Sequence, residues 1–345
     1  MTHKSKKNIL VLFCGGTISM HKNEKTGALD VAHGADQFFK LEPRIVELAN
    51  IDVHFIDNLD STNMTHVQWE KIVNEIKKEY HNYDGFLITQ GTNTLAYTSS
   101  AITWALLGIG KPVVLTGAQI PAEIISTDGR NNLVNALRVC TLNLGGVFVV
   151  FGSKIILGCR AKKVSESDLD AFKTFNKPDF GEIGVGLLIR DESRPGHTKE
   201  LKVKNGFEDN IISITLVPGL KADFLKEMID SGIKGMVLRG YGSGDIPYDF
   251  LPVLEYARKK KIPIVGTTQC PGGATVLGVN DAGLQALKAG LIQAYDMSME
   301  TMTTKLMWLI KQSVPYEKIK SKMHENMAGE IDTRKATVIL NKELE

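Results

Sequence analysis

Apolar runs alternate with helix-like segments along the first half of the chain, and this alternation constrains the fold most. Residues 9–13, 85–88, 112–115 and 147–151 are almost entirely apolar. Buried parallel strands have this composition because helices cover both of their faces. Helical periodicity lies between the runs, for example over residues 65–78, with Thr65 as the N-cap. The pattern predicts a wound α/β domain.

A polar stretch with a Pro-Gly pair separates this set of elements from a second one. Apolar strands are expected at residues 211–217, 235–239 and 262–266, followed by a terminal helix near 302–312. A chain of 345 residues is long enough to bury two hydrophobic cores. We therefore predict an N-terminal domain at residues 1–189, a linker at residues 190–209 and a C-terminal domain at residues 210–345.

Composition excludes several functional classes. The net charge is only +2 and the basic residues are scattered among acids, which argues against a nucleic-acid partner. No stretch approaches the length needed to cross a bilayer, so no membrane partner is expected. Cys14, Cys140, Cys159 and Cys270 are widely spaced, fit no metal-ligand pattern and are predicted to be free thiols. We therefore expect a cytoplasmic protein that needs no metal or other cofactor.

Two short segments directly after apolar runs place nucleophilic side chains beside small residues. Residues 14–19 (Cys-Gly-Gly-Thr-Ile-Ser) follow the run at 9–13, and residues 90–94 (Gln-Gly-Thr-Asn-Thr) follow the run at 85–88. The carboxyl ends of strands are where open α/β sheets bind ligands. A thiol and hydroxyls at such a place are groups that can attack a substrate. The sequence therefore predicts a site for nucleophilic chemistry.

These motifs resemble those of the bacterial-type L-asparaginases, and of their cytoplasmic type I branch in particular. That family carries Thr-Gly-Gly-Thr-Ile after its first strand and His-Gly-Thr-Asp-Thr after a later one. Residues 60–65, 116–121, 238–242 and 268–270 also read like the type I branch, so the resemblance covers nearly the whole chain. It implies a two-domain α/β fold, with a larger N-terminal wound domain and a smaller C-terminal one, assembled as a homodimer or homotetramer.

The resemblance also implies an activity, the hydrolysis of L-asparagine or a related small amide to the acid and ammonia through an acyl-enzyme. The residues at the catalytic positions are Cys14, Thr92, Asn93 and Lys163. The implied substrate-binding residues are Asp60, Ser61, Thr62, Gly91, Thr92, Asn93 and Ala118. A possible allosteric asparagine site is implied at Arg239, Thr268, Gln269 and Cys270.

The match breaks at catalytic positions. Cys14 replaces the nucleophilic threonine, Asn93 replaces the aspartate, and Gln90 replaces the histidine of the second motif. The tyrosine that the family carries on the loop after the first motif has no counterpart here. Lys162 stands where a threonine of the allosteric site is expected.

Three interpretations remain open. In the first, the enzyme works with a cysteine nucleophile, and the uncompensated charge of Lys163 lowers the pKa of Cys14. In the second, the chain is a catalytically impaired homologue that acts as an amino-acid-binding or regulatory protein. The third is a nucleotide-binding α/β protein, which the first loop disfavours because it lacks a Gly-x-Gly-x-x-Gly spacing.

Overall fold

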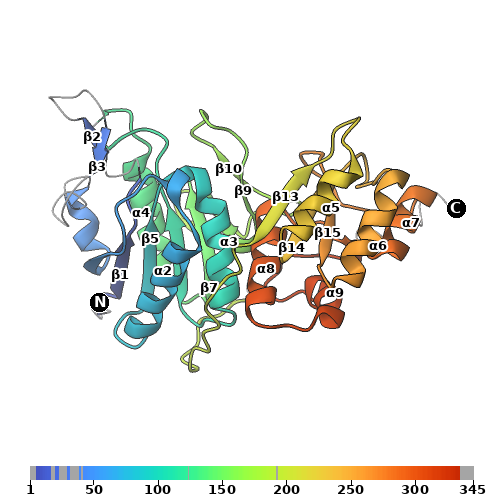
Figure 1. Cartoon of the computed structure of the whole chain (residues 1–345). Helices are drawn as coiled ribbons and strands as arrows, with labels where there is room; N and C mark the ends of the chain where they lie inside the picture. The colour runs from blue at the N-terminus through green and yellow to red at the C-terminus, as the bar shows by residue number, and fades with distance from the viewer. Residues whose placement is uncertain are drawn as a thin grey trace, which may run out of the picture. The chain divides into compact units, whose positions relative to one another are not determined.

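The computed structural model describes residues 5–16, 20–22, 29–31, 39, 42–122, 124–191 and 193–334. The chain divides into two compact units, which we call unit 1 (Met1–Asn205) and unit 2 (Gly206–Glu345). In Figure 1 unit 1 runs from blue to yellow-green and unit 2 from yellow to red.

Unit 1 is built on an eight-stranded sheet of order β12-β11-β8-β7-β6-β5-β1-β4. Its parallel strands are β1 (Asn8–Phe13), β4 (Asn50–Phe55), β5 (Gly85–Thr89), β6 (Pro112–Thr116) and β7 (Gly146–Phe151). Its antiparallel strands are β8 (Lys154–Leu157), β11 (Gly181–Ile183) and β12 (Leu187–Ile189). Every residue of β5, β6 and β7 is buried, which confirms the interpretation of the apolar runs as central strands.

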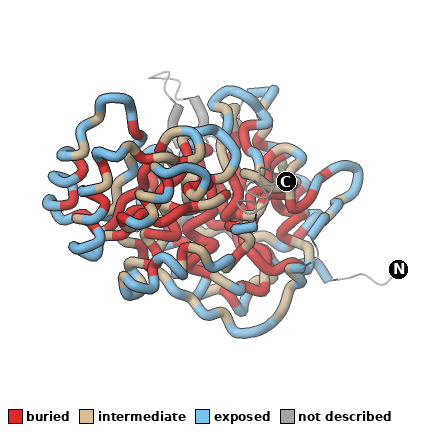
Figure 2. The backbone as a smooth tube through the Cα atoms, turned by 90° about the vertical axis from the view of Figure 1, so that its right-hand side faces the viewer, coloured by how far each residue is buried: buried red, intermediate tan, exposed pale blue. Residues whose placement is uncertain are grey.

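In the described part of unit 1 the α-helices are α2 (His66–Glu79), α3 (Leu95–Ala105) and α4 (Gly129–Cys140). Helices α3 and α4 contact the strands of this sheet, and α2 packs beside α3. Thr65 caps α2 in a capping box with Gln68, as its sequence predicts. Ten of the eleven residues of α3 are buried, so this helix is a core element with no solvent stripe. Figure 2 shows buried segments in the interior of the trace and exposed segments along its outer turns.

The strand order places a ligand-binding edge in unit 1. β1 lies between β4 and β5, so the chain leaves β1 toward one side of the sheet and later crosses to the other. Parallel sheets open a crevice at such a switch point, beyond the carboxyl ends of the strands. The loops after β1, β4 and β5 all begin at this edge. Two small antiparallel pairs complete unit 1: β2 (Met20–Lys22) with β3 (Leu29–Val31), and β9 (Ala161–Lys163) with β10 (Phe172–Thr174).

Unit 2 contains a four-stranded parallel sheet with helices around its own core. The strands are β13 (Ile211–Thr215), β14 (Gly235–Gly240), β15 (Ile264–Thr268) and β16 (Ile292–Gln293). The helices are α5 (Ala222–Asp230), α6 (Leu251–Lys259), α7 (Asp281–Ala289), α8 (Met299–Lys311) and α9 (Tyr316–His324). The core includes Leu225, Met236, Leu254 and Leu291. Two separate cores explain why the chain forms two domains.

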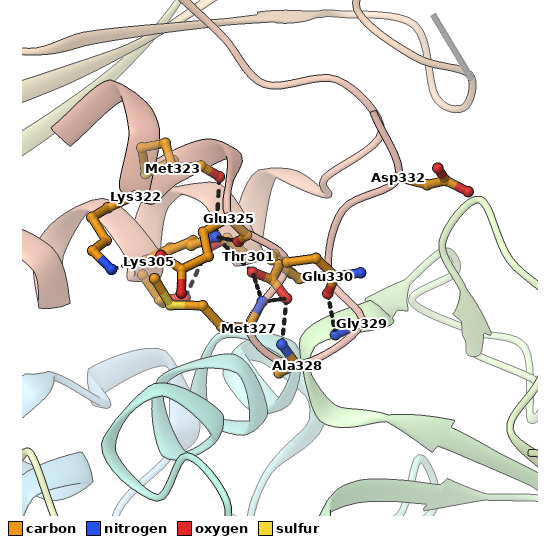
Figure 3. Close-up of polar contacts among 12 residues, drawn as sticks. Thr301, Lys305, Lys322, Met323, Glu325, Met327, Ala328, Gly329, Glu330 and Asp332 are labelled. Atoms are coloured by element: carbon orange, nitrogen blue, oxygen red, sulfur yellow. Dashed lines mark hydrogen bonds and ion pairs between the residues drawn. The ribbon is translucent and has the colours of Figure 1, made fainter. Parts of the chain in front are cut away.

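A fully buried ion pair fixes the end of unit 2 (Figure 3). Lys305 on α8 donates to Oε1 of Glu330 at 2.5 Å and to the carbonyl oxygens of Met323 and Glu325. The Glu330 carboxylate also accepts from the backbone N–H groups of Met327 and Ala328. Both charges are therefore hydrogen-bonded as well as paired, which burial requires.

Some predicted elements differ in the structure. The helix-like pattern from about residue 37 to 48 predicts a helix. This segment lies partly outside the described residues, and within it the structure forms a 3₁₀ helix, η2 (Pro43–Glu47). Helix α9 was not predicted, because its sequence YEKIKSKMH buries only Ile319 and Met323. No helix among the described residues is long and apolar enough to span a bilayer.

The polar stretch after β12 is held along unit 1. The N–H of His197 donates to Gly110 O, the N–H of Lys204 donates to Ala105 O, and the Asn205 amide donates to Glu70 O. Residues 196–210 form no helix or strand. The bounds 190–209 for a linker stay a prediction, but most of this segment is anchored to the first unit.

Candidate active site

Glycines bring the loops after β1, β4 and β5 into direct contact. Gly16 has a φ of +93°, and a Cβ there would overlap the backbone of Gly91. A Cβ on Gly91 would in turn lie 2.5 Å from Oγ of Ser61. The N–H of Cys14 donates to Thr89 O, which ties the first loop to the end of β5. Small residues are therefore required here because the three chain segments touch.

A lysine and a threonine form the chemical centre of this edge. Nζ of Lys163, at the end of β9, donates to Oγ1 of Thr92 at 2.8 Å and to Oδ1 of Asn93 at 3.3 Å. Thr92 and Asn93 begin the 3₁₀ turn η4 (Thr92–Thr94) directly after β5. Burial lowers the pKa of the Lys163 ammonium, and the Glu166 carboxylate partly opposes that shift. The structure thus holds an amine that loses its proton more readily than usual beside a hydroxyl.

Gln119 links this centre to two further segments. Its Oε1 accepts from the Thr92 hydroxyl at 2.9 Å, and its Nε2 donates to the carbonyl oxygens of Glu166 and Asp168. Its backbone N–H donates to both carboxylate oxygens of Asp128 at 3.0 Å. From the sequence, Gln119 is placed at a strand end but has no predicted role. The signal that could have identified Gln119 is its place as a polar residue at the end of an apolar run. The sequence contains no comparable signal for Asp128.

The predicted substrate-binding residues gather around the same turn. Asp60 caps the 3₁₀ turn η3 (Ser61–Asn63) by accepting from the N–H of Thr62 at 2.8 Å. Oγ1 of Thr62 accepts from the Asn93 amide at 3.0 Å, and Ser61 O accepts from the Thr94 hydroxyl. η3 and η4 are therefore bound together.

Ala118 follows β6 but presents its side chain to the hydrophobic core. Gln90, in contrast, is fully buried and polar. Its Oε1 has no hydrogen-bond partner among the described residues, although it stands directly before the Gly91–Thr92 turn.

The structure contradicts the prediction that Lys163 activates Cys14. The Cys14 side chain is 1% exposed, and its Sγ has one hydrogen bond among the described residues, to Leu12 O at 3.9 Å. Burial, and then the Asp57 carboxylate, raise the pKa of the thiol, and the charge of Lys71 opposes that rise. The predicted direction was downward. It was wrong because desolvation of the thiolate outweighs nearby positive charge, and the ammonium of Lys163 is bonded to Thr92 and Asn93 instead.

The four residues predicted for an allosteric site lie together in unit 2. The side chain of Arg239 reaches Gln269. Its guanidinium donates to the carbonyl oxygen of Gln269 and to Oγ1 of Thr215, both at 3.4 Å. Oγ1 of Thr268 accepts from the N–H of Cys270. Ligand binding by this group stays a prediction.

One group of side chains has the donor types that a metal ion needs. Ligand atoms of His54, Glu75 and Glu79 lie within 4.8 Å of one another on β4 and α2. Glu75 accepts from His54 at 2.9 Å, and Lys78 pairs with both glutamates. Lys78 offsets part of the negative charge of the two glutamates, and we assign the cluster no role in the site above.

Family models match most of the chain. The model described as "Asparaginase, N-terminal" matches residues 8–194, and the one described as "Glutaminase/Asparaginase C-terminal domain" matches residues 210–323. Among curated proteins, L-asparaginase 1 of Escherichia coli (strain K12) is 34% identical over 333 residues, which cover 94% of this chain and 98% of the relative. One of the subunits of the glutamyl-tRNA(Gln) amidotransferase of Pyrococcus abyssi is 32% identical over 334 residues, covering 94% of this chain and 76% of the relative.

Solved structures are similar over nearly the whole chain. The thermostable L-asparaginase from Thermococcus kodakarensis is 37% identical, with a TM-score of 0.88 over 94% of this chain and 99% of that one. L-asparaginase I from Vibrio cholerae is 32% identical, with a TM-score of 0.85 over 95% of this chain and 100% of that one.

Proposed function

The chain belongs to the asparaginase family, and on that premise we propose that it hydrolyses the side-chain amide of L-asparagine or a related small amide. Membership confirms the resemblance and the two-domain fold predicted from the motifs. The observation that carries the proposal is the 2.8 Å contact between Lys163 Nζ and Thr92 Oγ1, together with the lowered pKa of Lys163. An amine near a hydroxyl with this shift can serve as its general base.

We propose Thr92 as the nucleophile. Neutral Lys163 takes the hydroxyl proton while Oγ1 of Thr92 bonds to the amide carbon. The proton passes to the departing nitrogen and the carbon–nitrogen bond breaks. Ammonia departs, and the acyl group remains bound to Thr92 as an ester. Water then attacks that ester and the acid is released. One proton of the water passes to Oγ1 of Thr92 and restores the hydroxyl. The Thr92 hydroxyl now donates to Gln119, so it must rotate toward Lys163 before attack.

Substitutions at the two candidate nucleophiles test this assignment. Ammonia release from asparagine and from glutamine is measured for the unchanged protein and for Thr92→Ala, Lys163→Met and Cys14→Ala. We expect Thr92→Ala and Lys163→Met to lose at least about a hundredfold in kcat, since general base and nucleophile act as one unit. Cys14→Ala should keep activity. Loss in Cys14→Ala with activity kept in Thr92→Ala would reject Thr92 as the nucleophile.

A second candidate is ligand binding without turnover. It is favoured by the buried thiol with a raised pKa at the position where the family carries its nucleophile. An unchanged protein that binds asparagine in calorimetry but releases no ammonia from asparagine, glutamine or succinamate would establish this alternative and reject hydrolysis.

Family membership supports three further proposals. They are a cytoplasmic location, assembly as a homodimer or homotetramer, and a place in asparagine catabolism. The solved relative from Campylobacter jejuni is described as a probable cytoplasmic L-asparaginase. Sedimentation of the purified chain tests the assembly, and a single sedimenting monomer would reject it.

A further inference from the structure

The charge around Thr92 points to a narrower substrate class, an inference that rests on the proposed hydrolysis. We propose that the site prefers monoamides of small dicarboxylic acids that carry no ammonium group, and that it disfavours free amino acids such as asparagine. Succinamate, the monoamide of succinic acid, is the simplest member of this class.

The first observation is that the positive charge of Lys163 has no anionic partner among the described residues. Both of its hydrogen bonds end on neutral acceptors, the Thr92 hydroxyl and the Asn93 amide oxygen. Glu166 acts on it only through longer-range attraction, and its side chain is exposed to solvent. The neighbouring Lys162 lies over the ring of Phe175, 5.0 Å from its centroid, and forms no ion pair in the described chain.

The second observation is that hydrogen bonds at both ends fix the Asn93 amide. Its oxygen accepts from Lys163, and its nitrogen donates to Oγ1 of Thr62. The oxygen is therefore engaged, and the free N–H of the same amide is a donor. A donor and an ammonium both bind a carboxylate and both disfavour a cation.

The remaining carboxylate beside the turn, that of Asp60, is held in place by the backbone of η3. Asp60 accepts the N–H of Thr62 with Oδ1, which fixes it as the cap of η3. Before Lys163 loses its proton to act as the base, a substrate carboxylate meets an ammonium and an N–H donor, whereas a substrate ammonium meets the like charge of Lys163. Two like charges about 4 Å apart repel enough to change binding by roughly fivefold in bulk water and by several hundredfold at the effective dielectric typical of a protein surface.

The experiment compares substrates that differ in amine charge. We measure kcat/KM for ammonia release from succinamate, N-acetyl-L-asparagine and L-asparagine, with the unchanged protein and with Asn93→Asp. Succinamate lacks the amine, and acetylation removes its charge. We expect the unchanged protein to prefer succinamate over asparagine by about tenfold or more. Asn93→Asp should shift that ratio toward asparagine by about tenfold, because the new carboxylate neutralises Lys163 and attracts the ammonium.

Asn63→Asp is the matched control, since it adds the same charge on the neighbouring turn η3, where residue 63 has no hydrogen bond to Lys163 in the described part of the chain. We expect it to leave the substrate ratio unchanged. A preference for asparagine in the unchanged protein would overturn the inference while amide hydrolysis stands. An equal shift in Asn63→Asp and Asn93→Asp would also overturn it. Absence of ammonia release from all three amides, in both the unchanged protein and Asn93→Asp, would instead reject the proposed function.

Discussion

Replacing Asn93 with aspartate should move the pH profile of amide hydrolysis toward higher pH. Oδ1 of Asn93 lies 3.3 Å from Nζ of Lys163 and is uncharged. A unit negative charge at that distance stabilises the ammonium by about 1.3 kcal/mol even in bulk water, from 332/(80 × 3.3). This corresponds to roughly one pKa unit, and more where water is partly excluded.

The direction follows from which form of Lys163 acts. In the proposed mechanism the neutral amine takes the proton of Thr92, so the rate should rise as the pH passes the pKa of Lys163. Burial lowers that pKa in the unchanged protein. The introduced carboxylate raises it, so the rising limb should begin roughly one pH unit higher, or further.

The assay is kcat/KM for ammonia release, measured with a substrate that has no titrating amine, such as succinamate. Asn93→Ala removes the hydrogen bond without adding charge, and Asn63→Asp adds charge without that contact. Neither variant should move the rising limb of the kcat/KM profile to higher pH by a full unit. A limb that stays in place in Asn93→Asp would refute Lys163 as the base.

Three further outcomes are expected. Gln119→Leu should lower kcat by about tenfold with little change in KM, because Thr92 and the segment at Glu166 lose the amide that positions them. Steady-state kinetics checks this, and an unchanged kcat would contradict it. Iodoacetamide should label exposed Cys270 before buried Cys14, which mass mapping of peptides would show; the reverse order would contradict the raised pKa. Lys305→Met should destabilise unit 2 by about 3–5 kcal/mol, because Glu330 is left buried and charged, and Lys305→Met/Glu330→Gln should recover part of that loss. Urea unfolding followed by far-ultraviolet circular dichroism measures both, and equal stability of the single variant and the unchanged protein would reject the role.

Sequence reasoning predicted the elements whose signal is local. The apolar runs that became β1, β5, β6 and β7 are buried on both faces, so their composition alone identifies them. The cap of α2 is equally local, since Thr65 and Gln68 bond to the backbone beside them. The hairpin that carries Lys163 has no such signal. β9 is three residues long and only one of them is buried, so its place beside Thr92 depends on contacts 71 residues apart in the sequence.

The site shows the same division between local and distant information. Resemblance placed Thr92, Asn93 and Lys163 in one site, and the structure brings these three side chains together. The resemblance also placed Cys14 in this site as a nucleophile. Its expected activation depended on a single charge, that of Lys163. The reactivity of a thiol depends on its burial as well as its charged neighbours. Burial is set by packing from the whole domain, which a motif does not contain.

The exchange of aspartate for Asn93 therefore does not lower the pKa of Cys14 in the way that the first interpretation of the sequence predicts. An asparagine beside Lys163 leaves an uncompensated ammonium, but that ammonium points at Thr92 and not at the thiol. Its effect falls on the hydroxyl, because a lysine without a carboxylate partner loses its proton at lower pH. In the proposed mechanism, loss of the family's aspartate favours Lys163 as a base toward Thr92, and Cys14 takes no part in the reaction. The same neutral amide that makes Lys163 a better base removes the anionic group that a substrate ammonium would need. The basicity of Lys163 and the charge of the preferred amide should accordingly change together when residue 93 is exchanged.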